Sequence, residues 1–169
     1  MSGSGTDVPV IAPSRSILRW PSVLAVATFL GILSSLLAGE FTRATGQSPK
    51  WEWLLILNLS YWYTWALFTP AIVWLSQRFR LERQGLALAI LVHLPAVGFF
   101  SFAHIAAMGA IRWWIVTMDG KPYPWWYEVK SSALHNFDWE MITYWAIVGL
   151  SHAVLYYSES RRQIERAHV

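Results

Sequence analysis

Hydrophobic residues gather into four long runs along this chain, separated by short segments that carry charged, glycine and proline residues. The runs cover 17–38, 53–75, 86–116 and 137–157. Each run approaches or exceeds the roughly 20 residues with which a helix crosses about 30 Å of hydrocarbon. Because runs of this length are too long for single strands, they predict helices. The pattern therefore predicts an all-α fold, an integral membrane four-helix bundle occupying 17–157.

The overall composition agrees with a lipid environment. Of the 169 residues, 55% are hydrophobic and 14% are charged, which is more apolar and less charged than an ordinary soluble domain. The 12 tryptophans and 7 tyrosines are residue types that favour the membrane interface. The lipid bilayer is therefore the first expected partner.

Several function classes are not expected from this sequence. The chain has no cysteine, which excludes disulfides, thiolate metal ligands and cysteine nucleophiles. It contains no glycine-rich phosphate loop, no HExxH pair and no GxSxG elbow. Its basic residues are not gathered with aromatics into a nucleic-acid surface. No catalytic residue, metal site or nucleic-acid partner is predicted.

The basic residues predict the orientation of the spans. Lysine and arginine in short loops are retained in the cytoplasm. Eight of the 13 basic residues fall on one side of the four runs: Arg15, Arg19, Arg78, Arg80, Arg83, Arg161, Arg162 and Arg166. This bias predicts a multi-pass protein with both termini in the cytoplasm.

The two ends of the chain differ in character. Residues 1–16 are rich in glycine, serine and proline and predict a disordered cytoplasmic N-terminus. Residues 158–169 are charged and continue the helical pattern of the fourth run, with Tyr157 and Ile164 on a thin stripe of period near 3.5. The stripe indicates the start of a signalling helix and an expected homodimer. The alternative is a solvated helix end that only sets topology.

Three histidines lie inside the predicted spans, where ionisable groups are functional candidates. His93 and His104 are eleven residues apart, which places them on one helix face about 16 Å apart. His152 lies in the fourth run. These histidines are candidate sensing residues because imidazole changes charge near neutral pH. The favoured alternative is that neutral histidines hydrogen-bond across the bundle and hold its helices in register.

A redox protein is the alternative to a sensor. His93 and His152 lie at a similar depth and could ligate a haem iron from two helices. The aromatic run "YWYTWALF" at 61–68 could form a pocket for a quinone, although the favoured explanation is that its rings fill space between helices. The leading interpretation requires no cofactor.

Two carboxylates open the fourth run. Asp138 and Glu140 at a helix N-terminus would complement the helix dipole, which is a sufficient structural reason for them. The sharper hypothesis is a cation or ligand site beneath the outer loop, where His135 would join them. The spacing matches no dedicated metal motif.

Other positions concern helix packing. Pro70 and Pro95 each remove a backbone donor in mid-span and predict kinks that could act as hinges. Gly31, Ser35 and Gly39 are spaced four apart and predict a close helix approach. The approaching helix could belong to the same bundle or to a second copy of the chain.

Three segments resemble a known family. They are "YWYTWALFTPAIVWLSQRFRL", "LVHLPAVGFFSFAHIA" and "YWAIVGLSHAVLYYSESRRQIERA". Together they resemble the membrane-spanning sensor region of LytS/AlgZ-type bacterial sensor histidine kinases. The matching positions are Thr69, Pro70, Arg78, Arg80, His93, His104, Tyr144, Trp145, His152, Tyr156 and Tyr157.

The resemblance implies a function and also a departure from the family. It implies the input module of a two-component signalling histidine kinase in the bacterial inner membrane, which passes a signal through the fourth span to a cytoplasmic output. In the family, a phosphoacceptor motif containing "HFLFN" and a glycine-rich ATP-binding domain follow, and neither is present in these residues. A response regulator is therefore expected as a partner only through a kinase domain that this sequence lacks. The alternatives are the redox protein and a structural or transport subunit.

Overall fold

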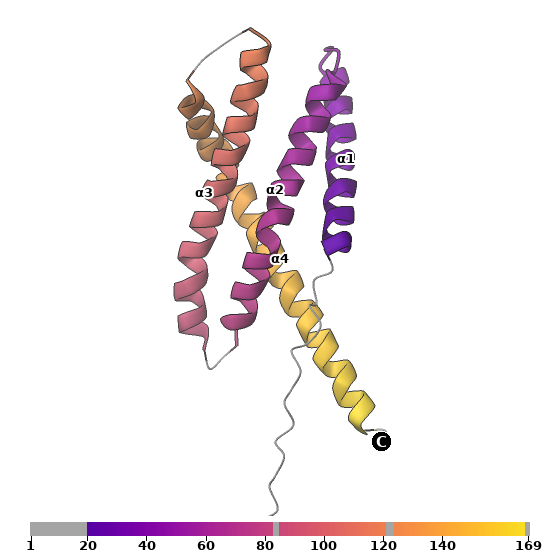
Figure 1. Cartoon of the computed structure of the whole chain (residues 1–169), viewed down its shortest axis with the longest axis vertical. Helices are drawn as coiled ribbons and strands as arrows, with labels where there is room; N and C mark the ends of the chain where they lie inside the picture. Colours follow the sequence, from indigo (N-terminus) through magenta and orange to yellow (C-terminus); the bar gives the residue numbers. More distant parts are fainter. Residues whose placement is uncertain (1–19, 83–84, 121–123, 168–169) are drawn as a thin grey trace, which may run out of the picture.

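Four helices form the described part of the chain. The computed structural model describes residues 20–82, 85–120 and 124–167. The helices are α1 (Trp20–Ala44), α2 (Trp51–Arg78), α3 (Leu86–Met118) and α4 (Trp125–Ala167), and the described residues contain no strand (Figure 1). The expected all-α fold is therefore confirmed. The segment predicted to be disordered, 1–16, lies outside the described residues.

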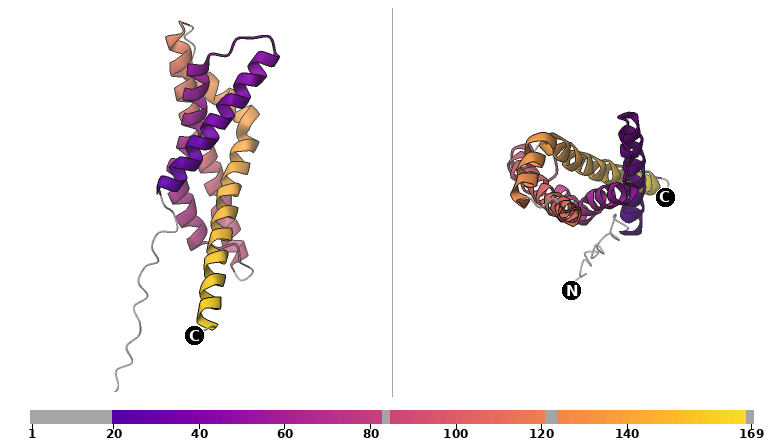
Figure 2. Two further views of the ribbon diagram at one scale, coloured as in Figure 1. Left: turned by 90° about the vertical axis from the view of Figure 1, so that its right-hand side faces the viewer. Right: turned by 90° about the horizontal axis from the view of Figure 1, so that it is seen from above.

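The helices alternate in direction and pack as two antiparallel pairs. α1 packs on α2, α3 packs on α4, and α2 also contacts both α3 and α4. Within the described ranges, α1 touches neither α3 nor α4. Figure 2 shows α1 at the side of the group that the other three helices form. The three-helix core of α2, α3 and α4 is therefore the part of the molecule in which side chains of three helices can meet.

The fourth helix extends beyond its predicted span in both directions. It begins at Trp125, directly after Pro124, a residue whose fixed φ suits a helix start. Its 43 residues form one continuous helix of about 65 Å at 1.5 Å per residue. Its C-terminal part projects past the lower ends of α2 and α3 (Figures 1 and 2).

Both span-interior prolines lie within helices that continue through them. Pro70 lies inside α2 and Pro95 inside α3. The Thr69 hydroxyl donates a hydrogen bond to the Trp65 carbonyl at 2.8 Å, just before the position where Pro70 removes a backbone donor. The Thr69 hydrogen bond thus adds a polar contact to the helical turn in which Pro70 leaves one backbone hydrogen bond unmade.

The small-residue stripe of α1 packs on α2 of the same chain. Gly31, Ser35 and Gly39 are all buried. Ser35 Oγ donates to the Leu54 carbonyl across the interface at 3.2 Å. A Cβ added at Gly31 would lie 2.7 Å from Leu59 Cδ2, so the two backbones approach too closely for a side chain. The question left open by the sequence is thereby answered: the approaching helix belongs to the same chain.

The exterior of the helices is unusually apolar. Large hydrophobic side chains are exposed on all four helices, including Phe41, Leu67, Leu91 and Leu150. α1 and α3 are long and apolar enough to cross a membrane, and only 22% of the most apolar window of each is buried. They are therefore not shielded like the core helices of a soluble domain. α2 and α4 do not reach the same apolarity, and α4 carries a buried glutamate and a charged tail.

Candidate functional site

A buried histidine and glutamate meet where α3 faces α4. His104 is fully buried and Glu140 is 3% exposed. His104 Nδ1 lies 2.8 Å from Glu140 Oε2. The other ring nitrogen, Nε2, donates to the Tyr61 carbonyl of α2 at 3.1 Å. His104 therefore joins three helices at one point.

The geometry of this pair fixes how many protons it holds. A carbonyl only accepts, so Nε2 of His104 carries a hydrogen. In a neutral imidazole, Nδ1 is then an acceptor and would face a second acceptor on Glu140. The close contact is stable only with a proton on one of the two groups, as an imidazolium facing a carboxylate or as a neutral ring facing a carboxylic acid. Nδ1 has no well-aligned hydrogen bond in this arrangement, so the contact is close but imperfectly directed.

Aromatic residues of α2 enclose the pair. Trp65 Nε1 donates to Glu140 Oε2 at 3.2 Å. The Trp65 ring stacks on His104 with ring centroids 5.0 Å apart and an interplanar angle of 23°. Tyr61 meets the other side of the imidazole edge-on, with centroids 4.5 Å apart. An electron-rich indole face is a favourable neighbour for a positively charged imidazolium.

A small pocket leads from the pair to the surface. Its volume is about 250 Å³, and its lining includes Tyr61, Glu140, Arg112, Ser132 and Asn136. Arg112 and Asn136 are exposed, so the pocket opens outward toward the end where α3 stops and α4 begins. Since one water occupies about 30 Å³ of liquid, the pocket has room for several waters among polar partners.

His93 forms a second three-helix junction, nearer the lower end. Its Nδ1 lies 2.8 Å from the Tyr144 hydroxyl of α4, and its Nε2 lies 3.2 Å from the Phe79 carbonyl at the end of α2. The carbonyl can only accept, so Nε2 donates to it, while Nδ1 and the Tyr144 hydroxyl share the second hydrogen bond. His93 thus links the end of α2 to α3 and α4.

The proposed haem pair does not form a ligand site in this arrangement. Both ring nitrogens of His93 are occupied by protein partners. His152 is partly exposed, and its buried Nε2 has no hydrogen-bond partner. An iron ligand at His93 would have to displace a bond that fixes three helices.

The hypothesis of an outer site built by His135, Asp138 and Glu140 is wrong. His135 and Asp138 are exposed, whereas Glu140 points into the core. Glu140 also lies about four turns after the start of α4 at Trp125, so the helix-dipole explanation fails as well. In the described ranges, no three His, Asp or Glu side chains lie close enough to hold a metal ion.

A groove separates the peripheral helix α1 from α4. It has a volume of about 780 Å³, and its walls are mainly apolar residues of α1, α2 and α4. The aromatic run contributes Tyr61, Trp62 and Trp65 to this groove. These rings therefore lie between helices and also line one wall of the apolar groove.

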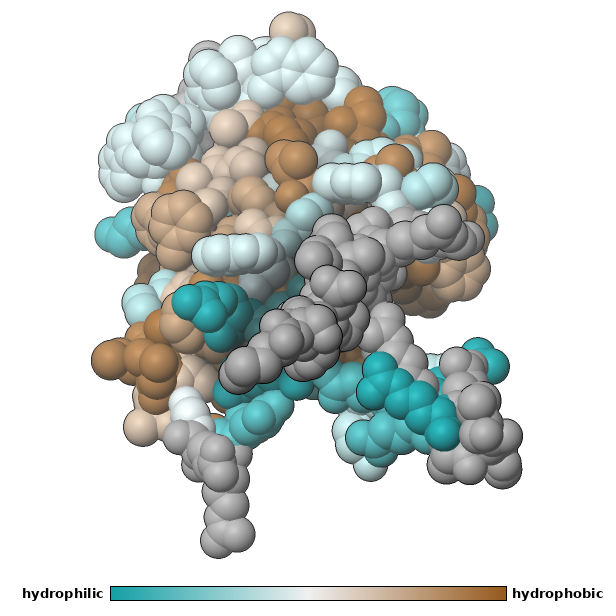
Figure 3. Space-filling model, turned by 60° about the horizontal axis from the view of Figure 1, so that its bottom comes forward, coloured by the Kyte–Doolittle hydropathy of each residue, from teal (hydrophilic) through white to brown (hydrophobic). Residues whose placement is uncertain are grey.

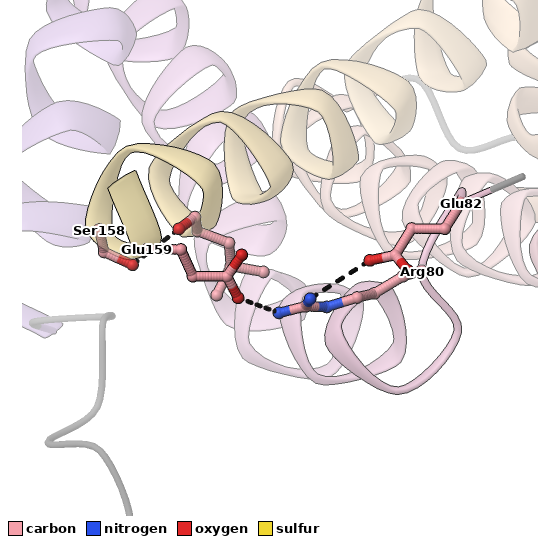
Figure 4. Close-up of polar contacts among 5 residues, drawn as sticks. Arg80, Glu82, Ser158 and Glu159 are labelled. Atoms are coloured by element: carbon pink, nitrogen blue, oxygen red, sulfur yellow. Dashed lines mark hydrogen bonds and ion pairs between the residues drawn. The ribbon is translucent and has the colours of Figure 1, made fainter. Parts of the chain in front are cut away.

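Ion pairs fasten the chain at both ends of the bundle. At the lower end, Arg80 bridges Glu159 of the α4 tail at 2.7 Å and Glu82 at 3.2 Å (Figure 4). The hydrogen bond with Glu159 raises the pKa of the Arg80 guanidinium. At the opposite end, Lys50 Nζ lies 2.8 Å from Asp119 Oδ2, and this bond raises the pKa of Lys50. The α4 tail is thus tied to the connection between α2 and α3.

The predicted dimer stripe is solvent-accessible. Tyr157 and Ile164 are exposed on the projecting part of α4. Figure 3 shows hydrophilic residues gathered at this end of the molecule and hydrophobic residues over the body behind it. The projecting helix therefore carries apolar side chains in a polar setting.

Comparison with known proteins returns nothing that constrains the function. No protein-family model, no curated protein and no solved structure matches this chain. Interpretation of the site therefore rests on its own geometry.

Proposed function

We propose that this chain is the transmembrane input module of a two-component signalling histidine kinase. The module lies in the bacterial inner membrane with four spans and both termini in the cytoplasm. The observation that carries the proposal is α4, a single 43-residue helix that contacts the buried polar core and continues as a projecting tail. Such a helix can transmit a movement inside the bundle to a domain attached beyond it.

The apolar exterior supports insertion in a bilayer. Contiguous exposed hydrophobic surface on all four helices would drive a soluble monomer to aggregate. In lipid the same surface needs no covering. The polar side chains of the core then face one another, as intramembrane ionisable groups normally do.

The distribution of arginines supports the orientation. Arg78, Arg80 and Arg161 lie at the end of the molecule where α2 stops and α4 projects. The positive-inside rule assigns that end to the cytoplasm. The tail would then extend toward the cytoplasm, where a kinase domain would act on its response regulator.

The exposed stripe of the tail supports a homodimer. Tyr157 and Ile164 lie seven residues apart, which is one heptad, and both are exposed. A second copy of the same helix, packed in parallel, would cover both side chains. Dimeric packing would let a rotation of each α4 be read by a paired output.

The orientation can be tested by thiol labelling, because the chain has no cysteine of its own. Gln47 lies in the exposed connection between α1 and α2, and Gln163 is exposed in the tail. In intact cells, an impermeant maleimide should label Gln47→Cys and should label Gln163→Cys only after permeabilisation. Labelling of both positions from outside would contradict the orientation.

Signal transmission can be tested with a phase scan. The chain through Ala167 is joined to a dimeric histidine-kinase output, and residues are inserted one at a time at the junction. Each inserted residue turns a helix by about 100°. Kinase output in a reporter strain should therefore vary with a period of about 3.6 inserted residues.

A matched control places the same insertions beside Gln47, in the loop before α2. That loop lies outside α4, so output should not follow helical phase there. An output that ignores insertions at the tail as well would show that the chain only anchors the kinase, and the sensor proposal would fail.

A further inference from the structure

We propose that His104 and Glu140 form a proton-binding site that exchanges protons with the outer side through the pocket beside Arg112. The site itself stands on the geometry of the buried pair and its pocket. Its role as the stimulus of the module rests on the proposed function.

His104 and Glu140 must hold a proton between them to keep their present contact. With Nε2 hydrogen-bonded to the Tyr61 carbonyl, removal of the shared proton leaves a bare Nδ1 2.8 Å from a carboxylate oxygen. Two acceptors at this distance repel each other, and burial removes the water that would screen them. Loss of the proton must therefore separate His104 of α3 from Glu140 of α4 or turn one of the side chains.

A proton can reach the pair through the pocket. Glu140 is buried, yet it also lines the pocket that opens past Asn136 and Arg112. Hydroxyl, amide and guanidinium groups along the walls can hold a short chain of water between the surface and the carboxyl group.

Few charged groups face the pair from the helices packed around it. From α2 these are the Tyr61 phenol and the Trp65 N–H, and from α3 the nearest permanent charge is Arg112. Arg112 is itself 3.7 Å from Glu128 of α4, which offsets its charge. α1 contacts only α2 and places no group here. Protonation of the pair therefore changes the main uncompensated charge in this part of the core.

The consequence is a movement between α3 and α4. α4 holds Glu140 at one level and the exposed tail about 20 residues later in one unbroken helix. A change in the His104 to Glu140 contact would tilt or turn that helix. The Arg80 to Glu159 ion pair is partly exposed, and exposed pairs resist such a movement only weakly. The protonated pair corresponds to the packed arrangement described above.

The experiment measures protonation and movement separately in the full-length chain, reconstituted in lipid nanodiscs. Nitrogen-15 NMR of the histidine side chains follows the His104 ring, assigned through His104→Gln. Spin labels at Gln77→Cys and Gln163→Cys follow the distance between α2 and the tail. We expect the His104 signals to titrate, and the distance distribution to shift as the pH rises. The shift should be lost in Glu140→Gln, whereas Asp138→Asn, an exposed carboxylate two residues away, should retain it.

A separate experiment tests whether protons reach the pair through the pocket. Asn136→Cys, modified with a bulky thiol reagent, should slow the response of the distance to a pH jump, because Asn136 lines the pocket. Asp138→Cys carrying the same reagent should respond like the unmodified chain.

The outcomes separate the two proposals. His104 signals that do not change with pH over the range in which the chain stays folded would overturn the proton site. His104 signals that titrate while the labels stay still would support the proton site and overturn its coupling to the tail, whereas the sensor function stands or falls with the phase scan of the tail.

Discussion

Replacing Glu140 by leucine should destabilise the folded chain by about 3–5 kcal/mol, the usual cost of removing one partner of a buried ion pair. The substitution removes the Glu140 oxygen that lies 2.8 Å from His104 Nδ1 and that accepts from the Trp65 N–H. Both groups are buried, so water cannot replace the lost partner. Reversible unfolding of the purified protein in mixed detergent gives the free energy directly.

The matched control for Glu140→Leu is Asp138→Leu. Asp138 lies on the same helix two residues earlier but is exposed, so its replacement should change the free energy of unfolding by no more than about 0.5 kcal/mol. The double variant His104→Leu with Glu140→Leu should cost less than the sum of the single variants, because it removes both members of the pair. Additive costs would mean that the two side chains do not interact.

Replacing Gly31 by leucine should destabilise the α1 to α2 pair by about 1–3 kcal/mol, as overpacking generally does. A Cβ at this position would meet Leu59 Cδ2 at 2.7 Å and the Leu59 Cα at 3.1 Å. The side-chain atom could move aside, but the backbone atom can move only if the helices separate. Because α1 packs on α2 alone, the damage should stay local.

The local character of this defect supplies its measurement. The hydrogen bond between Thr28 and Tyr63, 2.9 Å long, spans the same interface, so spin labels at Thr28→Cys and Tyr63→Cys report the separation of α1 and α2. The distance between the two labels should increase in Gly31→Leu, while the His104 signals of the core remain unchanged. Gly98→Leu is the control, because an added Cβ there meets nothing within 4 Å. A loss of the His104 signals in Gly31→Leu would show that α1 supports the core more than its contacts indicate.

Several features of the candidate site were out of reach of sequence reasoning. The spacing of His93 and His104 placed them on one face, and both are buried on that face. Each has a side-chain partner on α4 and a backbone carbonyl partner, which lies in α2 for His104 and directly after α2 for His93. No local pattern predicts a contact between residues so far apart in sequence. Trp65 and Tyr61 looked like space-filling aromatics, although their polar atoms and rings complete the site.

Glu140 shows why the error about the outer cluster arose. The start of the apolar run at residue 137 suggested that the helix also starts there, which would have put Glu140 at its N-terminus. The helix starts at Trp125, because the charged and aromatic segment before the run contains no helix-breaking residue between 125 and 136. A signal for this was present in the sequence, since Pro124 precedes a stretch without glycine or proline.

The close approach of α3 and α4 was also missed. A Cβ at Gly109 would lie 2.7 Å from Val129 Cγ2, so this glycine lets α4 pack tightly near the pocket. Gly109 has no small-residue repeat around it comparable to that of α1, and Val129 lay in a segment expected to be a loop. Gly109 packs against Val129 only because α4 begins at Trp125, before the predicted start at residue 137.

The sequence by itself determined that the chain is helical, because the long apolar runs and their lengths depend only on local composition and on the cost of leaving backbone groups unpaired in an apolar setting. It also determined which residues are chemically able to carry charge within those runs. The tertiary structure alone decided which of them meet. Antiparallel packing brings His104 to Glu140 and Arg80 to Glu159, and it turns His135 and Asp138 outward. The physical reason is that helix formation is governed by neighbours along the chain, whereas a buried polar contact depends on the rotation and stagger of two helices, which the packing of all their side chains sets together.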